Sequence, residues 1–209
     1  MRRIDVPWSH AIVAAGEARE SSFEFRGAGT VVAGLRLGDW FSDDEIACVP
    51  EFRLEKRRRE WVVSRVAAKQ LAIERGFCEE PRSCRIKGVS IESGERRACV
   101  SLSHSDPYVG AAISASPVGI DVQVVRDLPE HAAHLFLTRN EAAVMERCSI
   151  EHRILHFWCA KEAAWKALGG SVPTMVNVPI DLESESPAGL RFDTVETFAT
   201  GEIIVALTR

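Results

Sequence analysis

The chain has 209 residues, of which 46% are hydrophobic, and a formal net charge of -4. This length is sufficient for one substantial core or two smaller ones, and the negative net charge argues against a general nucleic-acid-binding protein. No stretch approaches the roughly 18 consecutive apolar residues of a membrane span, and the first twenty residues lack the apolar region of a signal peptide. We therefore expect a cytoplasmic protein that binds neither nucleic acid nor membrane.

The six cysteines show no CxxC pair and no regular spacing, which argues against a disulfide framework and against a zinc knuckle. A reducing compartment fits this pattern best. They stand at Cys48, Cys78, Cys84, Cys99, Cys148 and Cys159.

The first 50 residues read as short strands and turns, with glycines at Gly27, Gly29 and Gly34. A helix is then predicted from Glu55 to about residue 75, because apolar residues recur there near a 3.6-residue period and Gly76 supplies a stop.

Basic residues gather in and just before this helix. Five of the seven positions from 53 to 59 are lysine or arginine. Arg58, Arg65 and Lys69 are seven and four residues apart, a spacing that places them on one helical face. Lysine and arginine on one face form a candidate phosphate-binding surface.

Strands are predicted after the helix. Residues 84–93 read as one strand with a turn at Ser93 and Gly94, and residues 98–105 alternate as a half-buried strand. In the second strand Val100, Leu102 and His104 share one side and serines share the other. Taken alone, a serine-rich strand with a satisfied histidine is an equally good interpretation.

Residues 108–114 and 118–125 read as a hairpin, joined by a turn at 115–117. In its second strand Asp121 and Gln123 share one face, while isoleucine and valine occupy the other. A carboxylate in such a strand costs several kcal/mol unless it is paired or bound to a metal. An edge strand is the alternative reading.

Two helices are predicted next, at about 131–147 and 151–168, and residues 202–207 read as the closing strand. Trp158, Glu162 and Lys166 follow one another at i, i+4 steps and form one ridge. An exposed Glu–Lys pair beside a core tryptophan is the simpler explanation of that ridge. His152 and His156 share the same spacing, but no third ligand accompanies them, so we interpret them as surface histidines.

The chain divides into two halves of similar content, residues 1–115 and 116–209, each with one long helix. Residues 64–72 loosely resemble residues 160–168, which aligns Arg65 with Lys161 and indicates an ancient duplication.

Taken together and in order, these motifs resemble the Sfp-type 4'-phosphopantetheinyl transferases. SLSHS (101–105), GIDV (119–122) and WCAKEAAWK (158–166) are similar to the family patterns SxSHS, GID and WxxKEAxxK. The basic segment 56–72 and LFLTRNEAAVM (135–145) are similar to two further family segments. The resemblance covers about residues 45–170.

The resemblance implies an α+β fold, in which two similar halves form a pseudodimer within one monomer. It implies an enzyme that moves 4'-phosphopantetheine from coenzyme A to a serine of an apo acyl or peptidyl carrier protein. The reaction releases 3',5'-ADP and uses Mg²⁺, as in holo-acyl-carrier-protein synthases.

The resemblance also assigns roles to residues. Asp121 and Glu162 are the implied metal ligands, with Gln123 a weak ligand or one acting through water. Glu162 is further implied as the base for the carrier serine, with Lys166 and His104 in the catalytic set. The implied contacts with coenzyme A come from Lys56, Arg58, Arg65, Gly94, Ser103, His104, Lys161 and Lys166.

Two positions depart from the family pattern. Gln123 stands where the family usually has glutamate, which leaves the site with one negative charge fewer. The turn at Gly94 lacks the proline and cation that usually follow the glycine, so Arg96 or Arg97 is the expected substitute near the adenine.

Two other functions are compatible with the same residues. A non-catalytic module that binds coenzyme A or a carrier protein would not need the missing acid. A metal-dependent phosphoester hydrolase would use Asp121 and Glu162 with water as the acceptor, and it would consume coenzyme A without any carrier.

Overall fold

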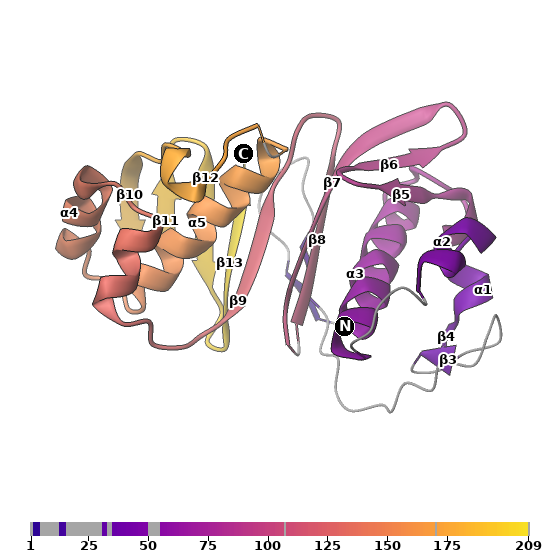
Figure 1. The fold of residues 1–209 in the computed structure, drawn as a ribbon, viewed down its shortest axis with the longest axis horizontal. Coiled ribbons are helices and arrows are strands. Elements are labelled where there is room, and N and C mark those ends of the chain that lie inside the picture. Colours follow the sequence, from indigo (N-terminus) through magenta and orange to yellow (C-terminus); the bar gives the residue numbers. More distant parts are fainter. Residues whose placement is uncertain are drawn as a thin grey trace. The chain divides into compact units, whose positions relative to one another are not determined.

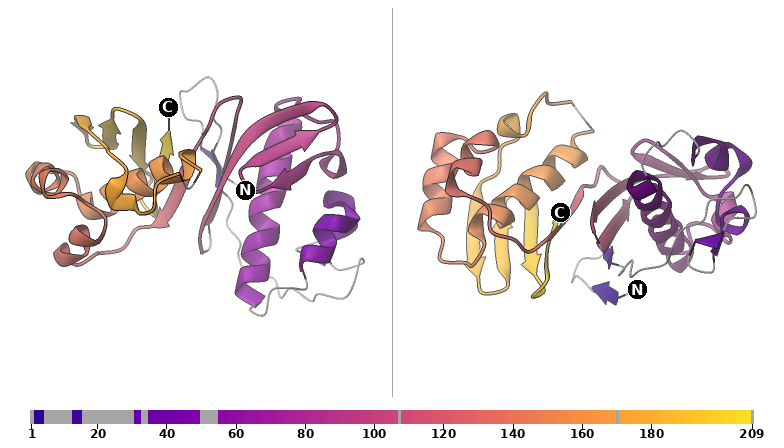
Figure 2. Two further views of the ribbon diagram at one scale, coloured as in Figure 1. Left: turned by 45° about the horizontal axis from the view of Figure 1, so that its top comes forward. Right: turned by 60° about the horizontal axis from the view of Figure 1, so that its bottom comes forward.

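The computed structural model describes residues 2–4, 13–15, 31–32, 35–49, 55–106, 108–169 and 171–208. The chain divides into two compact units, residues 1–116 and 117–209. In each unit one long helix lies against an antiparallel sheet (Figures 1 and 2). The expected α+β class is therefore confirmed. Within the described ranges, no helix has both the length and the apolar character to cross a membrane.

Unit 1 is built on a four-stranded sheet in the order β5-β6-β7-β8, and helix α3 packs against β7 and β8. Small side chains make this packing close, because Ala67, Ala68 and Ala72 of α3 are buried in one core with Ile91 and Ala111 of the sheet. The elements of unit 1 are β1 (Arg2–Ile4), β2 (Val13–Ala15), β3 (Val31–Val32), β4 (Leu35–Arg36), α1 (Leu37–Trp40), α2 (Asp43–Cys48), α3 (Glu55–Glu74), η3 (Pro81–Ser83), β5 (Arg85–Lys87), β6 (Ser90–Ser93), β7 (Arg96–Ser105) and β8 (Tyr108–Ser114).

Helix α3 confirms the predicted basic helix and ends one residue earlier than expected, at Glu74. Gly76 follows with a φ of 64°, the left-handed conformation that glycine adopts at little cost. The single strand expected at 84–93 is wrong. Two antiparallel strands, β5 and β6, occupy it, and the turn between them contains Gly88 with a φ of 57°.

The prediction of strands and turns over residues 1–50 is wrong at its end, where α1 and α2 are helices. Helix α2 begins with a capping box, in which Ser42 and Glu45 each bond the backbone N–H of the other. Gly27, Gly29 and Gly34 lie outside the described residues.

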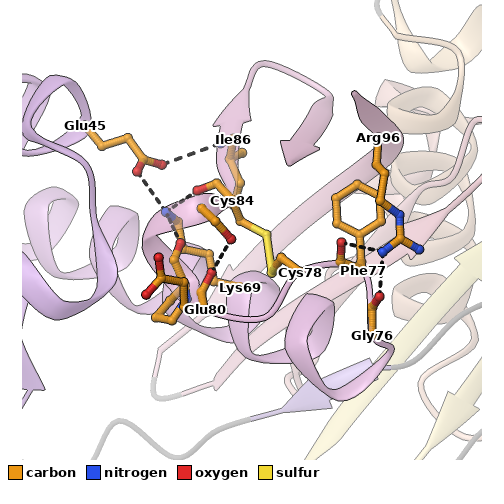
Figure 3. Close-up of a disulfide and its surroundings, with 11 residues drawn as sticks. Glu45, Lys69, Gly76, Phe77, Cys78, Glu80, Cys84, Ile86 and Arg96 are labelled. Atoms are coloured by element: carbon orange, nitrogen blue, oxygen red, sulfur yellow. Dashed lines mark hydrogen bonds and ion pairs between the residues drawn. A yellow bond between two sulfur atoms is a disulfide. The ribbon is translucent and has the colours of Figure 1, made fainter. Parts of the chain in front are cut away.

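Cys78 and Cys84 form a disulfide, with their Cα atoms 6.4 Å apart (Figure 3). The expectation that the cysteines stay unpaired is therefore wrong for this pair. The reason is local, because the two residues flank the short segment that leads from α3 to β5. Spacing along the chain does not reveal such a closure.

Unit 2 is built on a five-stranded sheet in the order β10-β11-β12-β13-β9. Helix α5 crosses strands β9, β13 and β12, and its core includes Phe157, which meets Phe192 edge to face. The elements of unit 2 are β9 (Ile120–Val124), η4 (Glu130–Leu135), α4 (Arg139–Arg147), α5 (Arg153–Ala167), η5 (Met175–Asn177), β10 (Leu182–Ser186), β11 (Gly189–Phe192), β12 (Val195–Ala199) and β13 (Ile203–Thr208).

The hairpin expected from residues 108–125 does not form. Strand β8 pairs with β7, whereas β9 pairs with β13 from the far end of the chain. The segment between them carries the boundary between the two units. The helix expected at 131–147 is also divided, because Thr138 caps a new helix, α4, after the short η4.

A buried lysine occupies the same kind of environment in each unit. In unit 1, Lys69 of α3 lies 2.8 Å from Glu45 and donates to the carbonyl of Cys84 at 2.6 Å (Figure 3). Glu45 also bonds its own helix cap at Ser42 and accepts from the N–H of Ile86 at 3.5 Å.

In unit 2, Lys161 of α5 lies 2.6 Å from Glu141 and donates to the carbonyl of Val178. Glu141 likewise bonds its helix cap at Thr138 and accepts from the N–H of Ile180 at 3.3 Å. In both units, therefore, the helix-capping glutamate holds a fully buried lysine of the long helix. These contacts match Lys69 with Lys161, which corrects the alignment of Arg65 with Lys161 by one turn of helix.

Candidate functional site in the C-terminal unit

Asp121, Glu162 and Lys166 meet between strand β9 and helix α5. The ammonium of Lys166 lies 2.9 Å from Asp121 Oδ1 and 3.2 Å from Glu162 Oε1. It also donates to the backbone carbonyl of Ile120 at 3.0 Å. Asp121 is fully buried, whereas the side chain of Glu162 keeps 24% of its exposure. Two carboxylates therefore share one cation, and one of them is open to solvent.

The elements explain this meeting. Side chains alternate along a strand, so Asp121 and Gln123 lie on one face of β9, as predicted. Glu162 and Lys166 are one helical turn apart on α5, so the predicted i, i+4 pair forms. Gln123 forms a hydrogen bond with the other oxygen of this aspartate, since its amide nitrogen donates to Asp121 Oδ2 at 3.1 Å.

Gly119 allows the helix to come this close to the strand. A Cβ at this position would lie 1.8 Å from the backbone oxygen of Ala163 and 2.9 Å from the backbone nitrogen of Ala167. Backbone atoms cannot retreat as a flexible side chain does. The absence of a side chain at Gly119 therefore sets the separation between the beginning of β9 and α5.

The charges of the cluster act on one another. Burial raises the pKa of Glu162, the negative charge of Asp121 raises it further, and Lys166 opposes both effects. Burial alone would lower the pKa of Lys166, but Asp121 and Glu162 outweigh it and the pKa of Lys166 is raised. Lys166 therefore holds its proton more firmly than an isolated lysine does, and one oxygen of each carboxylate faces it.

This donor set suits a hard divalent cation. Carboxylate and amide oxygens are ligands that Mg²⁺ accepts, and Mg²⁺ commonly takes one or two protein carboxylates together with substrate phosphates. Asp121 Oδ1 and Glu162 Oε1 lie 2.9 and 3.2 Å from the same lysine nitrogen, so both carboxylates are placed to share one cation. Among the residues that the structure describes there is no group of three or more acidic, histidine or cysteine side chains arranged to hold a metal.

Cys159 is a neighbour of this site that the sequence did not point to. Its thiol is fully buried on α5, and the pKa of the thiol is raised well above its usual value by burial and then by the negative charges of Asp121 and Glu162. A lone cysteine in an apolar helical stretch carries no local signal that it lies beside Asp121.

The predicted basic helix lines a pocket within unit 1, with a volume of about 270 Å³. Arg65 stacks on the ring of Trp61, with its guanidinium carbon 4.1 Å from the ring centre. His104 faces this pocket from β7, and its Nε2 lies 3.1 Å from Glu60 Oε2. The pocket is lined by Arg57, Glu60, Trp61, Ser64, Arg65, Leu102 and His104.

Glu60 was also not predicted, and it offsets part of the positive charge. Lys56 lies 3.8 Å and Arg57 3.6 Å from its carboxylate, although both cations remain largely exposed. Arg65 lies deeper, and burial lowers its pKa from the usual arginine value while the negative charge of Glu45 opposes this. A partly desolvated guanidinium attracts an anion more strongly than an exposed one does. Arg65 is therefore the strongest candidate for a phosphate contact among the predicted basic residues.

Three further residues that were predicted to contact coenzyme A lie in different places. Ser103 is buried on the face of β7 opposite His104, and it does not line the pocket. Gly94 has a φ of 58° in the two-residue turn from β6 to β7, so the turn itself accounts for the glycine. Arg96 donates to the carbonyls of Gly76 and Phe77 at 2.7 and 2.9 Å (Figure 3), and the adenine contact expected of Arg96 or Arg97 stays a prediction.

Lys161 and His156 need correction. Lys161 was predicted to contact coenzyme A, but its side chain is fully buried and its ammonium bonds Glu141 and Val178 in the core. His156 was interpreted as a surface residue, but it is 1% exposed and its Nδ1 lies 2.8 Å from Thr197 Oγ1. Arg53, at the start of the predicted basic run, lies outside the described residues.

Comparison with known proteins supports the motif-based resemblance. The family model of the 4'-phosphopantetheinyl transferase superfamily matches residues 117–203, which include Asp121, Glu162 and Lys166. A 4'-phosphopantetheinyl transferase, gsp, of Aneurinibacillus migulanus is 31% identical over 80 residues, which are 37% of this chain and 34% of that protein. The match thus spans about a third of the relative's length. Residues 117–203 of this chain are thus similar to the 4'-phosphopantetheinyl transferase superfamily.

Proposed function

We propose that this protein transfers the 4'-phosphopantetheine group of coenzyme A to a serine of an apo acyl or peptidyl carrier protein and releases 3',5'-ADP. One observation carries the proposal. The family-matched segment brings two carboxylates and a lysine together at one partly open position, with separations of 2.9 and 3.2 Å. The relative's name supports the same group transfer.

The residues have distinct tasks in this reaction. The serine oxygen of the carrier attacks the phosphorus next to pantetheine, and the bond from that phosphorus to the bridging oxygen breaks, so the electron pair leaves with 3',5'-ADP. Glu162 accepts the serine proton, a task that suits a carboxyl whose pKa is raised above its usual value. Lys166 offsets the charge that develops on the leaving phosphate.

Asp121, Glu162 and weakly Gln123 would hold Mg²⁺, which neutralises pyrophosphate charge when it is bound. Asp121 suits this role because its burial keeps it in place, with an oxygen fixed by Gln123. The pocket of unit 1 is proposed as a second contact region for coenzyme A, through Arg65 and His104.

We also propose that the two units descend from a duplication, which would make the fold a pseudodimer within one chain. The matching environments of Lys69 and Lys161 support this. On the same alignment Gln70 corresponds to Glu162, and Glu74 to Lys166, so the catalytic carboxylate would be present in unit 2 alone. The monomeric state and the cytoplasmic location remain predictions.

The decisive experiment is mass spectrometry of several apo carrier proteins after incubation with this protein, coenzyme A and Mg²⁺. The proposal predicts a mass gain of one phosphopantetheinyl group on a carrier serine, and none when Mg²⁺ is chelated. Coenzyme A consumed equally without a carrier would indicate a phosphoester hydrolase. Binding of coenzyme A without transfer to any carrier would indicate a binding module.

A further inference from the structure

Lys166 lies between the two carboxylates that would hold a metal ion. Its ammonium has three N–H donors, and three acceptors surround it: Asp121 Oδ1, Glu162 Oε1 and the carbonyl of Ile120. The lysine side chain keeps only 23% of its exposure. All three N–H donors of Lys166 therefore have acceptors within the protein. Two of these acceptors are the carboxylates that would hold the metal.

The other oxygen of the aspartate is engaged too, because Gln123 donates to Asp121 Oδ2. A divalent cation that binds Asp121 and Glu162 must therefore compete with the ammonium of Lys166 for the same oxygens. Two cations on one carboxylate oxygen repel each other strongly in a buried site. Sharing is unfavourable, so one cation replaces the other.

We propose that metal binding displaces Lys166 from the two carboxylates, and that this exchange couples the metal to the substrate. Without substrate, the lysine holds the site and keeps its affinity for divalent cations low. A substrate phosphate offers the ammonium a new acceptor, so substrate and metal favour each other's binding. This inference rests on the proposed function, because it takes coenzyme A as the source of that phosphate, and it adds a reason for ordered assembly of the site.

The test is the affinity of the protein for Mn²⁺ without coenzyme A, measured by electron paramagnetic resonance of the free ion. Lys166→Met removes the competing charge, and Lys166→Gln removes the charge but keeps an N–H donor for Asp121. We expect both variants to bind Mn²⁺ about ten times more tightly than the wild type or more, since an internal competitor is gone. Lys166→Arg keeps the charge and is the matched control, with affinity close to that of the wild type.

Equal or weaker Mn²⁺ binding by the folded neutral variants would overturn the inference. If loss of the charge prevents folding in the absence of metal, recovery of the circular dichroism spectrum on addition of Mn²⁺ would support it, and no recovery would contradict it. The wild type provides a further measurement that needs no variant. Saturating Mg²⁺ should increase acetylation of Lys166 but not of Lys161, which is buried in the same helix; an unchanged Lys166 would also contradict displacement.

These outcomes are separable from the proposed function. A wild type that modifies carrier proteins, combined with variants that gain no affinity, would refute the exchange alone. Variants that gain affinity, combined with a wild type that modifies no carrier, would leave the cation exchange in place and refute the transfer reaction.

Discussion

The ammonium of Lys161 and the carboxylate of Glu141 lie 2.6 Å apart in the core of unit 2. Lys161 directly precedes Glu162 in the sequence. Lys161→Met should destabilise the protein by about 3–5 kcal/mol, because it leaves a buried carboxylate without its cation. Urea unfolding measures this. Lys56→Met, at a largely exposed position, is the control and should cost less than about 1 kcal/mol. A stable Lys161→Met protein with a raised KM for coenzyme A would contradict this structural role and would support the original prediction that Lys161 contacts coenzyme A.

Asp121→Asn and Glu162→Gln should each reduce transfer by about 100-fold or more, the scale expected when several kcal/mol of charge stabilisation are lost. Both substitutions preserve shape, so the circular dichroism spectrum should not change. Asp181→Asn, at an exposed aspartate of the same unit, is the matched control and should leave turnover unaltered. Near-normal transfer by either folded site variant would rule out the assigned roles.

Gln123→Glu should stay active and reach half-maximal rate at a lower concentration of free Mg²⁺, because it adds a negative charge beside Asp121. The same charge should lower the melting temperature of the metal-free protein, since two carboxylates then face each other, and Mg²⁺ should restore it. Gln123→Ala should lose much less activity than Asp121→Asn. Magnesium titrations at saturating coenzyme A compare the variants, and a higher magnesium requirement for Gln123→Glu would contradict this placement.

Arg65→Ala should raise the KM for coenzyme A more than it lowers kcat, because the partly buried guanidinium contributes to binding rather than to bond breaking. Added salt should raise the KM of the wild type in the same direction. Arg75→Ala serves as the control, since Arg75 is exposed just after α3. A normal KM combined with a reduced kcat would place Arg65 elsewhere in the reaction.

His156 should make the protein sensitive to acid. Burial, and to a smaller extent the nearby His152, lower the pKa of His156 to about 4, whereas the unfolded chain has a histidine pKa of about 6.5. Above pH 6.5 both states are neutral and His156 has no effect on stability. Between pH 6.5 and 4 the unfolded state binds the proton first, so up to about 3 kcal/mol is lost. Urea unfolding across this range should show the slope, and His156→Gln should remove it.

Local patterns in the sequence predict the elements well where one helix or strand determines the outcome. The period of α3, the shared face of Asp121 and Gln123, and the step from Glu162 to Lys166 all follow from regular backbone geometry. Pairing between distant segments does not follow from it. The expected hairpin failed because β9 pairs with β13, more than 75 residues away in the chain.

The sequence also did not show which charged side chains are buried. Lys161 and Lys166 stand five residues apart on α5 and look alike in the sequence, yet one faces Glu141 in the core and the other faces Asp121 in the site. Which of them is buried depends on the position of α4, and that position is a matter of tertiary packing. The disulfide between Cys78 and Cys84 was missed for a local reason, because the path of the short segment between α3 and β5 cannot be deduced from the spacing of the cysteines.

The contact between Gly119 and α5 has a consequence for protein engineering. Because a Cβ there would meet backbone oxygen at 1.8 Å, any larger residue must push the strand and the helix apart. Asp121 lies two residues further along the strand, and both Glu162 and Lys166 lie on the helix. A design that transplants the acidic pair and the lysine into another scaffold would therefore have to reproduce this close backbone contact first. The contact sets the distance between the strand and the helix, and so the distances between the side chains.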